Sequence, residues 1–271
     1  MNIAPLTANE LLAALALPSS ALVQQRIPKK MLAENGAATS ADRKLVQDGI
    51  DELAWHAALK PSNVGIPAYE DELRSYLEVT VLVARLRTEV VATDQHRSPQ
   101  APAAVSTNVR RVAELIHRAV PYPTVLLLEH GHQLVASVVH VRWAQREAGK
   151  TVLDGDSISV PIKPGPECRA FLEAMALGRQ PRFHLKALYQ GWFDTLSAWQ
   201  AVEQTGQFRT SESPARAAER RAALRACTEL DVRIATARNA AAKEKQIARQ
   251  VAVNLEIKAL LAERQRVAQD L

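Results

Sequence analysis

The chain has 271 residues, of which 47% are hydrophobic and 4% aromatic, and its formal net charge is +5. This composition excludes a disordered chain, and the charge is too small to identify an anionic partner. The two cysteines, Cys168 and Cys227, have no metal-ligating neighbours, which excludes a disulfide framework and a zinc site. No strongly apolar run approaches the roughly 20 residues that span a bilayer. We expect a soluble, cytoplasmic protein with no membrane contact and no cofactor.

Two helices are predicted near the N-terminus. Thr7 can cap a helix whose apolar run ends at Pro18. A second amphipathic helix is predicted to begin near Ser40 and to end before Pro61, because its apolar residues repeat at helical spacing. Those residues are Leu45, Val46, Ile50, Leu53, Ala54 and Trp55.

The middle of the chain alternates between strand and helix. Tyr76–Val91 is the clearest strand, because β-branched and polar residues alternate in it. The proline- and serine-rich stretch Thr93–Thr107 is predicted to be a flexible connection. Asn108 can cap the helix that follows, which Pro121 ends.

Three further strands complete the predicted sheet. Thr124–Leu128 and Gln133–Trp143 flank the turn signal Glu129–His132, which indicates a hairpin, and Ser157–Ile162 follows. The fold class is therefore predicted to be α+β, with a small, mostly antiparallel sheet and flanking helices on one face. We place this domain at residues 1–203.

The C-terminal part of the chain has a different character. A helix over Phe183–Val202 is followed by a polar linker, residues 204–213, and then by a basic helical arm, residues 214–271. The arm contains neither Gly nor Pro after Pro214, so one long coiled-coil-like helix, or a hairpin of two helices, is expected. Residues 212–271 hold 12 Lys and Arg against 8 Asp and Glu, a net charge of +4.

The heptad pattern of the arm is imperfect. Its apolar seam slips by one step through Ile247, Val251 and Leu255. This irregularity favours packing against a differently shaped partner, or against the protein's own body, over a strict dimeric coiled coil. A solvated helix surface with pairs such as Glu229 and Arg233 also accounts for the charges.

Candidate contact residues lie in two places. Pro28 keeps the segment Arg26–Lys30 out of a helix, which exposes cations suited to phosphate contact. Polar side chains beside the seam of the arm contribute little to stability and are therefore candidates for specific contacts. The residues predicted to bind nucleic acid or a partner are Arg26, Lys29, Lys30, Lys243, Lys245, Gln246, Arg249, Gln250 and Asn254.

Three ordered segments resemble one known family. They are Arg26–Lys30, Ala119–Pro123 before a strand, and Lys243–Gln246 continuing to Ile257. In this order they resemble the bacterial domain-of-unknown-function family numbered 4391, and the resemblance covers essentially the whole chain. Members are typically encoded beside helicases and adenine DNA methyltransferases in restriction or phage-defence clusters. The resemblance implies a helicase or DNA methyltransferase partner and carries over no catalytic residues.

Signatures of catalysis are weak. Gly149-Lys150-Thr151 resembles the end of a phosphate-binding loop, but Ala144 occupies the position of the required glycine. The Glu-x-Lys motif at Glu256 lies inside the arm, which is the wrong context for a metal-dependent nuclease.

Three functional hypotheses follow. The first is a non-enzymatic accessory or adaptor subunit of a DNA-acting defence or restriction-modification-like assembly, whose arm contacts DNA or a partner protein. The second is a homodimeric coiled-coil scaffold. The third is a metal-dependent nuclease that uses Glu70, Asp71, His130 or His132.

Overall fold

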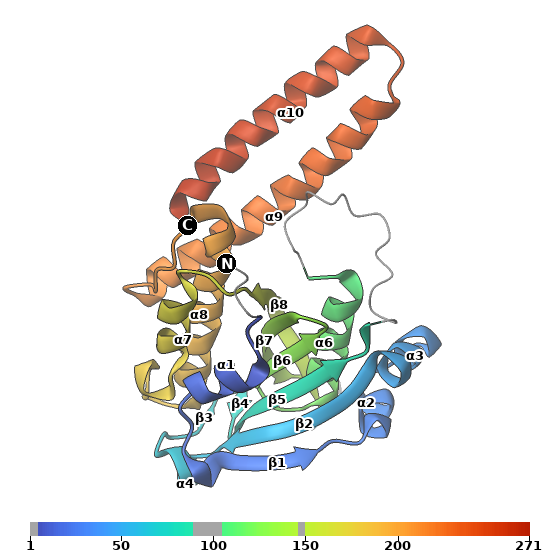
Figure 1. Cartoon of the computed structure of the whole chain (residues 1–271). Coiled ribbons are helices and arrows are strands. Elements are labelled where there is room, and N and C mark those ends of the chain that lie inside the picture. The colour runs from blue at the N-terminus through green and yellow to red at the C-terminus, as the bar shows by residue number, and fades with distance from the viewer. Residues whose placement is uncertain (1–4, 89–104, 146–149) are drawn as a thin grey trace. The chain divides into compact units, whose positions relative to one another are not determined.

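The computed structural model describes residues 5–88, 105–145 and 150–271 (Figure 1). The chain divides into two compact units, residues 1–196 and 197–271. The predicted flexible connection, Thr93–Thr107, falls mostly outside the described residues. None of the helices in the described ranges has the length and apolar character needed to cross a membrane.

The first unit is built on a six-stranded sheet. All neighbouring strands are antiparallel except β5 and β6, which are parallel, so the sheet is mixed. Helix α6 (Thr107–Ala119) lies between these two strands in the sequence and connects them. In spatial order the strands are β1 (Leu22–Arg26), β2 (Ile50–Leu59), β5 (Val79–Leu86), β6 (Thr124–His130), β7 (Gln133–Trp143) and β8 (Thr151–Ile162).

Helices cover both faces of the sheet. Leu126 and Leu128 of β6 belong to a core that includes α2 (Lys29–Asn35), α3 (Ser40–Gly49) and α6. The intervening residues of β6 are also buried, and α1 (Ala8–Ala14) packs on their side. The predicted arrangement, with helices on one face only, is therefore wrong, and the continuous apolar run of β6 is typical of a strand buried on both sides.

Helix α8 (Leu185–Thr205) begins in the first unit, where Tyr189 fixes it to the sheet. The Tyr189 hydroxyl accepts a hydrogen bond from the Val139 amide at 3.0 Å and donates toward the Thr124 carbonyl at 2.9 Å.

The remaining elements are short. They are η1 (Ser19–Ala21), α4 (Pro61–Val64), β3 (Tyr69–Glu70), β4 (Ser75–Tyr76), α7 (Cys168–Met175), η2 (Leu177–Arg179) and η3 (Ala268–Asp270).

One predicted helix is wrong over its second half, which forms a strand. The helix predicted from Ser40 toward Pro61 ends at Gly49, and the residues after it form β2. Strand β2 pairs with β5 from Ile50, opposite Leu86, to Leu59, opposite Val79. The apolar residues of β2 also fit helical spacing, so pairing with a strand far away in the sequence decides its structure.

Both edges of the sheet are irregular. In β1, Gln24 adopts a left-handed backbone conformation with φ 51°, and the pairing with β2 shifts register there. In β8, Gly155 has φ 80° and Pro161 lacks a backbone donor.

The second unit contains an antiparallel hairpin of two helices, α9 (Pro214–Lys243) and α10 (Ile247–Val267), which lie side by side in Figure 1. The prediction of a single long helix is therefore wrong, and the alternative prediction of a hairpin of two helices is correct. The break falls at Glu244, which leaves the helical conformation and accepts a hydrogen bond from the Gln246 amide at 2.9 Å.

The inner seam of this hairpin is apolar at its centre and charged beside it. Leu230 and Ile234 of α9 pack with Leu260 of α10. Arg264 forms two hydrogen bonds with the Asp231 carboxylate, at 2.5 and 3.0 Å, which ties the helices together near this cluster.

Candidate interaction surfaces

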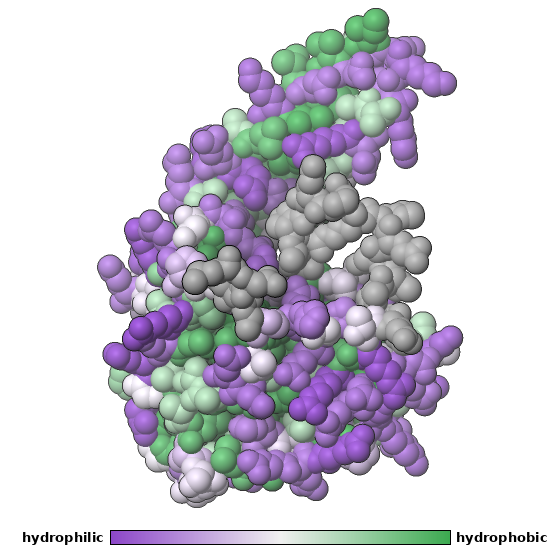
Figure 2. All heavy atoms as spheres, in the orientation of Figure 1, coloured by the Kyte–Doolittle hydropathy of each residue, from purple (hydrophilic) through white to green (hydrophobic). Residues whose placement is uncertain are grey.

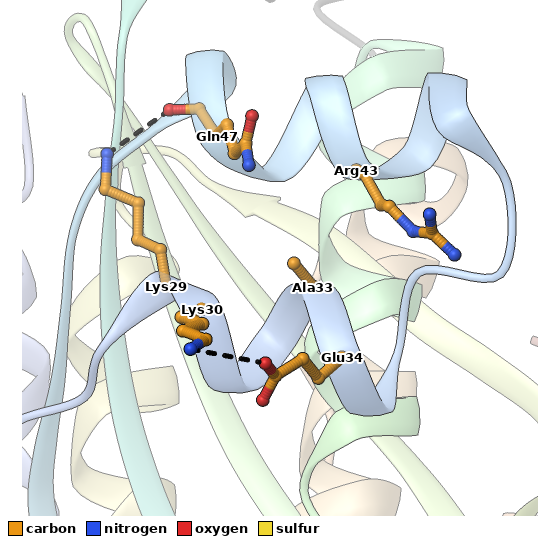
Figure 3. Close-up of a pocket in the computed structure, with 6 residues that line it drawn as sticks. All are labelled: Lys29, Lys30, Ala33, Glu34, Arg43 and Gln47. Carbon is orange, nitrogen blue, oxygen red and sulfur yellow. Dashed lines mark hydrogen bonds and ion pairs between the residues drawn. The ribbon is translucent and has the colours of Figure 1, made fainter.

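The Arg26–Lys30 segment borders an open hollow between α2 and α3, shown in Figure 3. Pro28 is the N-cap residue of α2, so the fixed proline backbone sets where the helix begins and where its first two lysines project. The residues that line the hollow are Lys29, Lys30, Ala33, Glu34, Arg43 and Gln47.

The two lysines of this hollow differ in how they are bonded within the protein. The Lys29 ammonium donates to the Ile50 carbonyl at 2.5 Å and to the Gln47 carbonyl at 3.3 Å. These carbonyls lie at the C-terminal end of α3, where a cation also interacts favourably with the helix dipole. Lys30 points toward Glu34, 3.7 Å away, and remains 85% exposed. Lys29 is thus held by backbone, whereas Lys30 is accessible to an external anion.

Arg26 does not join this hollow. It ends the exposed edge strand β1, where it pairs with Ala54, and it is not among the lining residues. The three cations of the predicted phosphate-contact segment are therefore divided between two environments.

The other predicted contact residues gather at the tip of the helical hairpin. Lys243 is the last residue of α9, and Lys245 and Gln246 form the turn. Arg249 and Asn254 are exposed in the first turns of α10. Gln250 donates to the Ala241 carbonyl across the hairpin at 3.4 Å. The predicted contact residues of the arm thus come from both helices and from the turn between them.

Beside this tip, α10 carries a row of exposed aliphatic side chains, which we call the aliphatic row: Ile247, Val251 and Leu255. Their exposed fractions are 78%, 53% and 64%. Figure 2 shows hydrophobic surface on the hairpin near its tip. Successive members are four positions apart, so the row follows one side of the helix.

The aliphatic row does not belong to the inner seam. At about 100° per residue, Leu255 projects about 140° away from Leu260, which is only 4% exposed. Sequence reasoning assigned the row to a shifted coiled-coil seam and so missed it as a free surface. The one-step slip of the heptad pattern was the signal that could have revealed this surface, because it marks where the chain turns and a new helix face begins.

The residues of the nuclease hypothesis serve structural roles or lie apart. Asp71 accepts hydrogen bonds from the Tyr69 hydroxyl at 2.7 Å and from the Leu73 and Arg74 amides at 2.9 and 2.6 Å. These bonds lower the pKa of Asp71 to about 2, and the bond from Tyr69 has the largest effect. The positive charge of Lys186, 3.7 Å away, lowers it further. Asp71 therefore stabilises the β3–β4 turn.

The histidines of that hypothesis lie in another hairpin. His130 pairs with Gln133 where β6 meets β7, and His132 lies in the turn between them. His140 would be the third ligand of a metal site with His130 and His132, but it lies seven positions farther along β7 than Gln133, which is about 23 Å at 3.3 Å per residue. Over residues 5–88, 105–145 and 150–271, no group of three or more His, Cys, Asp or Glu side chains could hold a metal ion.

A comparison with known families gives one match. The sequence model described as "Domain of unknown function (DUF4391)" matches residues 15–263. The chain belongs to this family. The match confirms the resemblance carried by the three sequence segments, and it extends into α10, so most of the hairpin lies within the extent of the family. No curated protein and no solved structure gives a significant match.

Proposed function

We propose that the protein is a non-catalytic adaptor that uses its helical hairpin to dock on a partner protein within a DNA-acting defence or restriction-modification-like assembly. The aliphatic row of α10 carries this proposal. Its side chains contribute nothing to the inner seam, whose apolar contacts come from Leu230, Ile234 and Leu260.

An exposed aliphatic row provides free energy for binding. Fully burying a Val, Leu or Ile side chain contributes about 1.5–3 kcal/mol, so covering the three side chains can support a specific contact. Single exposed apolar residues are ordinary on protein surfaces, but a continuous row on one side of a helix is typical of a groove-binding or helix-binding element.

The distribution of charge favours a protein partner over DNA. Arg264 is bonded to Asp231, and Arg216 pairs with Glu219 at 2.6 Å. These cations are neutralised within the hairpin, whereas a DNA-binding helix presents a concentrated basic face. DNA contact is a second candidate function, favoured by the gathering of Lys243 and Lys245 at the tip.

A helicase or a DNA methyltransferase encoded in the same gene cluster is the proposed partner. The family resemblance supports this choice, because members typically stand beside such genes. The hairpin supports the mode of contact, because its row is accessible along two turns of helix.

The test is co-purification of the tagged full chain with the proteins encoded beside its gene. Val251→Asp together with Leu255→Asp is expected to weaken the contact by at least about 10-fold, because each substitution replaces an apolar contact with a carboxylate that must lose its water. Val232→Asp is the matched control, since Val232 is 62% exposed on α9, outside the row. Equal recovery of the partner with all variants would contradict the proposal.

The homodimeric scaffold predicts a different outcome. If the row serves self-association, the full chain sediments as a dimer, and the paired Asp substitutions convert it to a monomer. Under the adaptor proposal, the full chain is monomeric in both forms.

A further inference from the structure

We infer that the outer face of α10 receives one acidic amphipathic helix of the partner. This inference rests on the proposed function and specifies the chemistry of the docking element. It is argued from the side chains that share the face of the aliphatic row.

The face is apolar from Ile247 to Leu255, and Lys258 follows close to the same line. Taking about 100° per residue, Ile247 and Leu255 lie within about 40° of Val251, and Ala262 lies about 20° from it. Ala248 and Ala259 lie within about 80°, and all these residues are exposed. Because alanine is small, another helix can approach this face closely, toward the lower end of the 8–10 Å range of helix–helix distances.

The charges on this face have one sign. Lys258 lies about 20° and Arg266 about 60° from Val251, and both are exposed. The acidic residues of α10, Glu256 and Glu263, lie about 140° and 120° away, toward the other side of the helix. A partner helix that covers the aliphatic row and continues along this face to Arg266 therefore meets two cations and no carboxylate of α10.

This pattern disfavours a second copy of the chain. Two such faces brought together would place the cations of one copy near those of the other in a partly dehydrated contact. An acidic helix instead supplies the missing carboxylates. Lys258 and Arg266 are eight residues apart, about 12 Å along the axis, so the partner's carboxylates are expected about two turns apart.

A membrane surface also attracts apolar and basic faces, but α10 lacks the aromatic residues that anchor helices at such surfaces. Its apolar face is instead mostly alanine and β-branched residues, which suits helix packing. The acidic helix is therefore the occupant that this face fits.

The experiment measures binding of the full chain to synthetic 21-residue helical peptides by fluorescence anisotropy. One peptide carries a leucine stripe flanked by glutamates, a second carries the same stripe flanked by lysines, and a third scrambles the first. We expect the acidic peptide to bind at least about 10-fold more tightly than the other two.

Charge reversal on the protein provides the decisive variant. Lys258→Glu with Arg266→Glu changes two exposed side chains, so the fold is expected to persist, and the preference is expected to switch to the lysine peptide. Val251→Asp is expected to weaken the binding of both peptides, whereas Val232→Asp is expected to leave the binding of both unchanged. Equal binding of acidic and basic peptides, or no switch on charge reversal, overturns the inference.

Other occupants give distinct results. A dimer in sedimentation that Leu255→Asp dissolves would identify a second copy and overturn the inference. Binding to phosphatidylserine vesicles that depends on Ile247 would identify a membrane and overturn it as well. If the co-encoded partner is lost with Val251→Asp but the acidic peptide does not bind, the inference fails while the proposed function stands. If neither contact depends on Val251, both fail.

Discussion

His117 is a fully buried titratable side chain beneath the sheet. On α6 it is 3% exposed, and its Nε2 lies 3.0 Å from the Ser137 hydroxyl, which in turn lies 2.9 Å from the Ser159 hydroxyl. Burial lowers the pKa of His117 to about 3, because the charged imidazolium would lose its water.

This shift predicts that acid destabilises the protein. Since the folded-state pKa of His117 lies below its ordinary value of 6.5, the unfolded chain binds this proton more readily. The stabilisation is complete above about pH 6.5 and is lost as the pH falls toward 3, by up to about 1.4 kcal/mol per unit. In urea unfolding, the free energy of unfolding is expected to differ less between pH 7.5 and pH 5 in His117→Gln than in the wild type. His132→Gln, in an exposed turn, is the control, and an unchanged difference in His117→Gln would contradict the prediction.

Lys29 and Lys30 are neighbours with different expected effects on stability. Lys29→Met removes the donor to the carbonyls that end α3 and is expected to lower the free energy of unfolding by about 1–2 kcal/mol. Lys30→Met removes only an exposed pair with Glu34 and is expected to change it by less than about 0.5 kcal/mol. Chemical denaturation of both variants checks this difference, and equal losses would show that the bonds of Lys29 contribute nothing.

At the scale of elements, Gly36 sets how closely α2 approaches α6. A Cβ added at Gly36 would lie 2.4 Å from the Leu115 carbonyl oxygen of α6. Gly36→Ala is therefore expected to destabilise the protein by about 1–3 kcal/mol, because backbone must move. At Gly178 an added Cβ would meet no heavy atom within 4 Å, so Gly178→Ala is the matched control. Similar melting temperatures for the two variants would refute the close approach.

The two faces of α10 differ in what they stabilise. Leu260→Ala removes a buried side chain of the inner seam and is expected to cost about 2–4 kcal/mol, with faster hydrogen exchange in both helices. Leu255→Ala, on the aliphatic row, is expected to leave exchange unchanged. Faster exchange in Leu255→Ala would mean that the row supports the hairpin and is not free for a partner.

Elements with a strong local signal could be predicted from the sequence. The strands predicted at Thr124–Leu128 and Gln133–Trp143 are confirmed as β6 and β7, and Gly131 in the turn between them adopts the positive φ of 58° that such a turn needs. The strand predicted over Tyr76–Val91 is confirmed as β5 over Val79–Leu86, and residues 89–91 lie outside the described residues. The capped helix α1 is also confirmed: the Thr7 hydroxyl accepts from the Glu10 amide at 3.3 Å, and the Glu10 carboxylate accepts from the Thr7 amide at 2.8 Å.

Other features depend on contacts that the sequence does not reveal. The β2 strand is decided by its partner β5, and the turn at Glu244 occurs without Gly or Pro. The surface at the hairpin tip could be predicted as a set of polar residues. The aliphatic row could not, because only the fold of the hairpin determines which apolar residues of α10 face inward.

At the scale of the whole molecule, salt dependence separates protein docking from DNA binding. A DNA-binding protein with 6–10 phosphate contacts loses about 10³–10⁵-fold in affinity between 50 and 200 mM salt. Docking through the aliphatic row and two cations is expected to change by less than about 10-fold over this range, because apolar burial is not screened. Binding of the partner measured at several salt concentrations checks this, and a steep loss would favour the DNA-contacting function.

The irregular sheet edges also affect how molecules can associate. A straight edge strand presents free amide and carbonyl groups to which a strand of another molecule can add, and such addition leads to aggregation. The bulge at Gln24 interrupts this ladder in β1, and Gly155 and Pro161 interrupt it in β8. The first unit is thereby protected against joining its sheet to that of another copy.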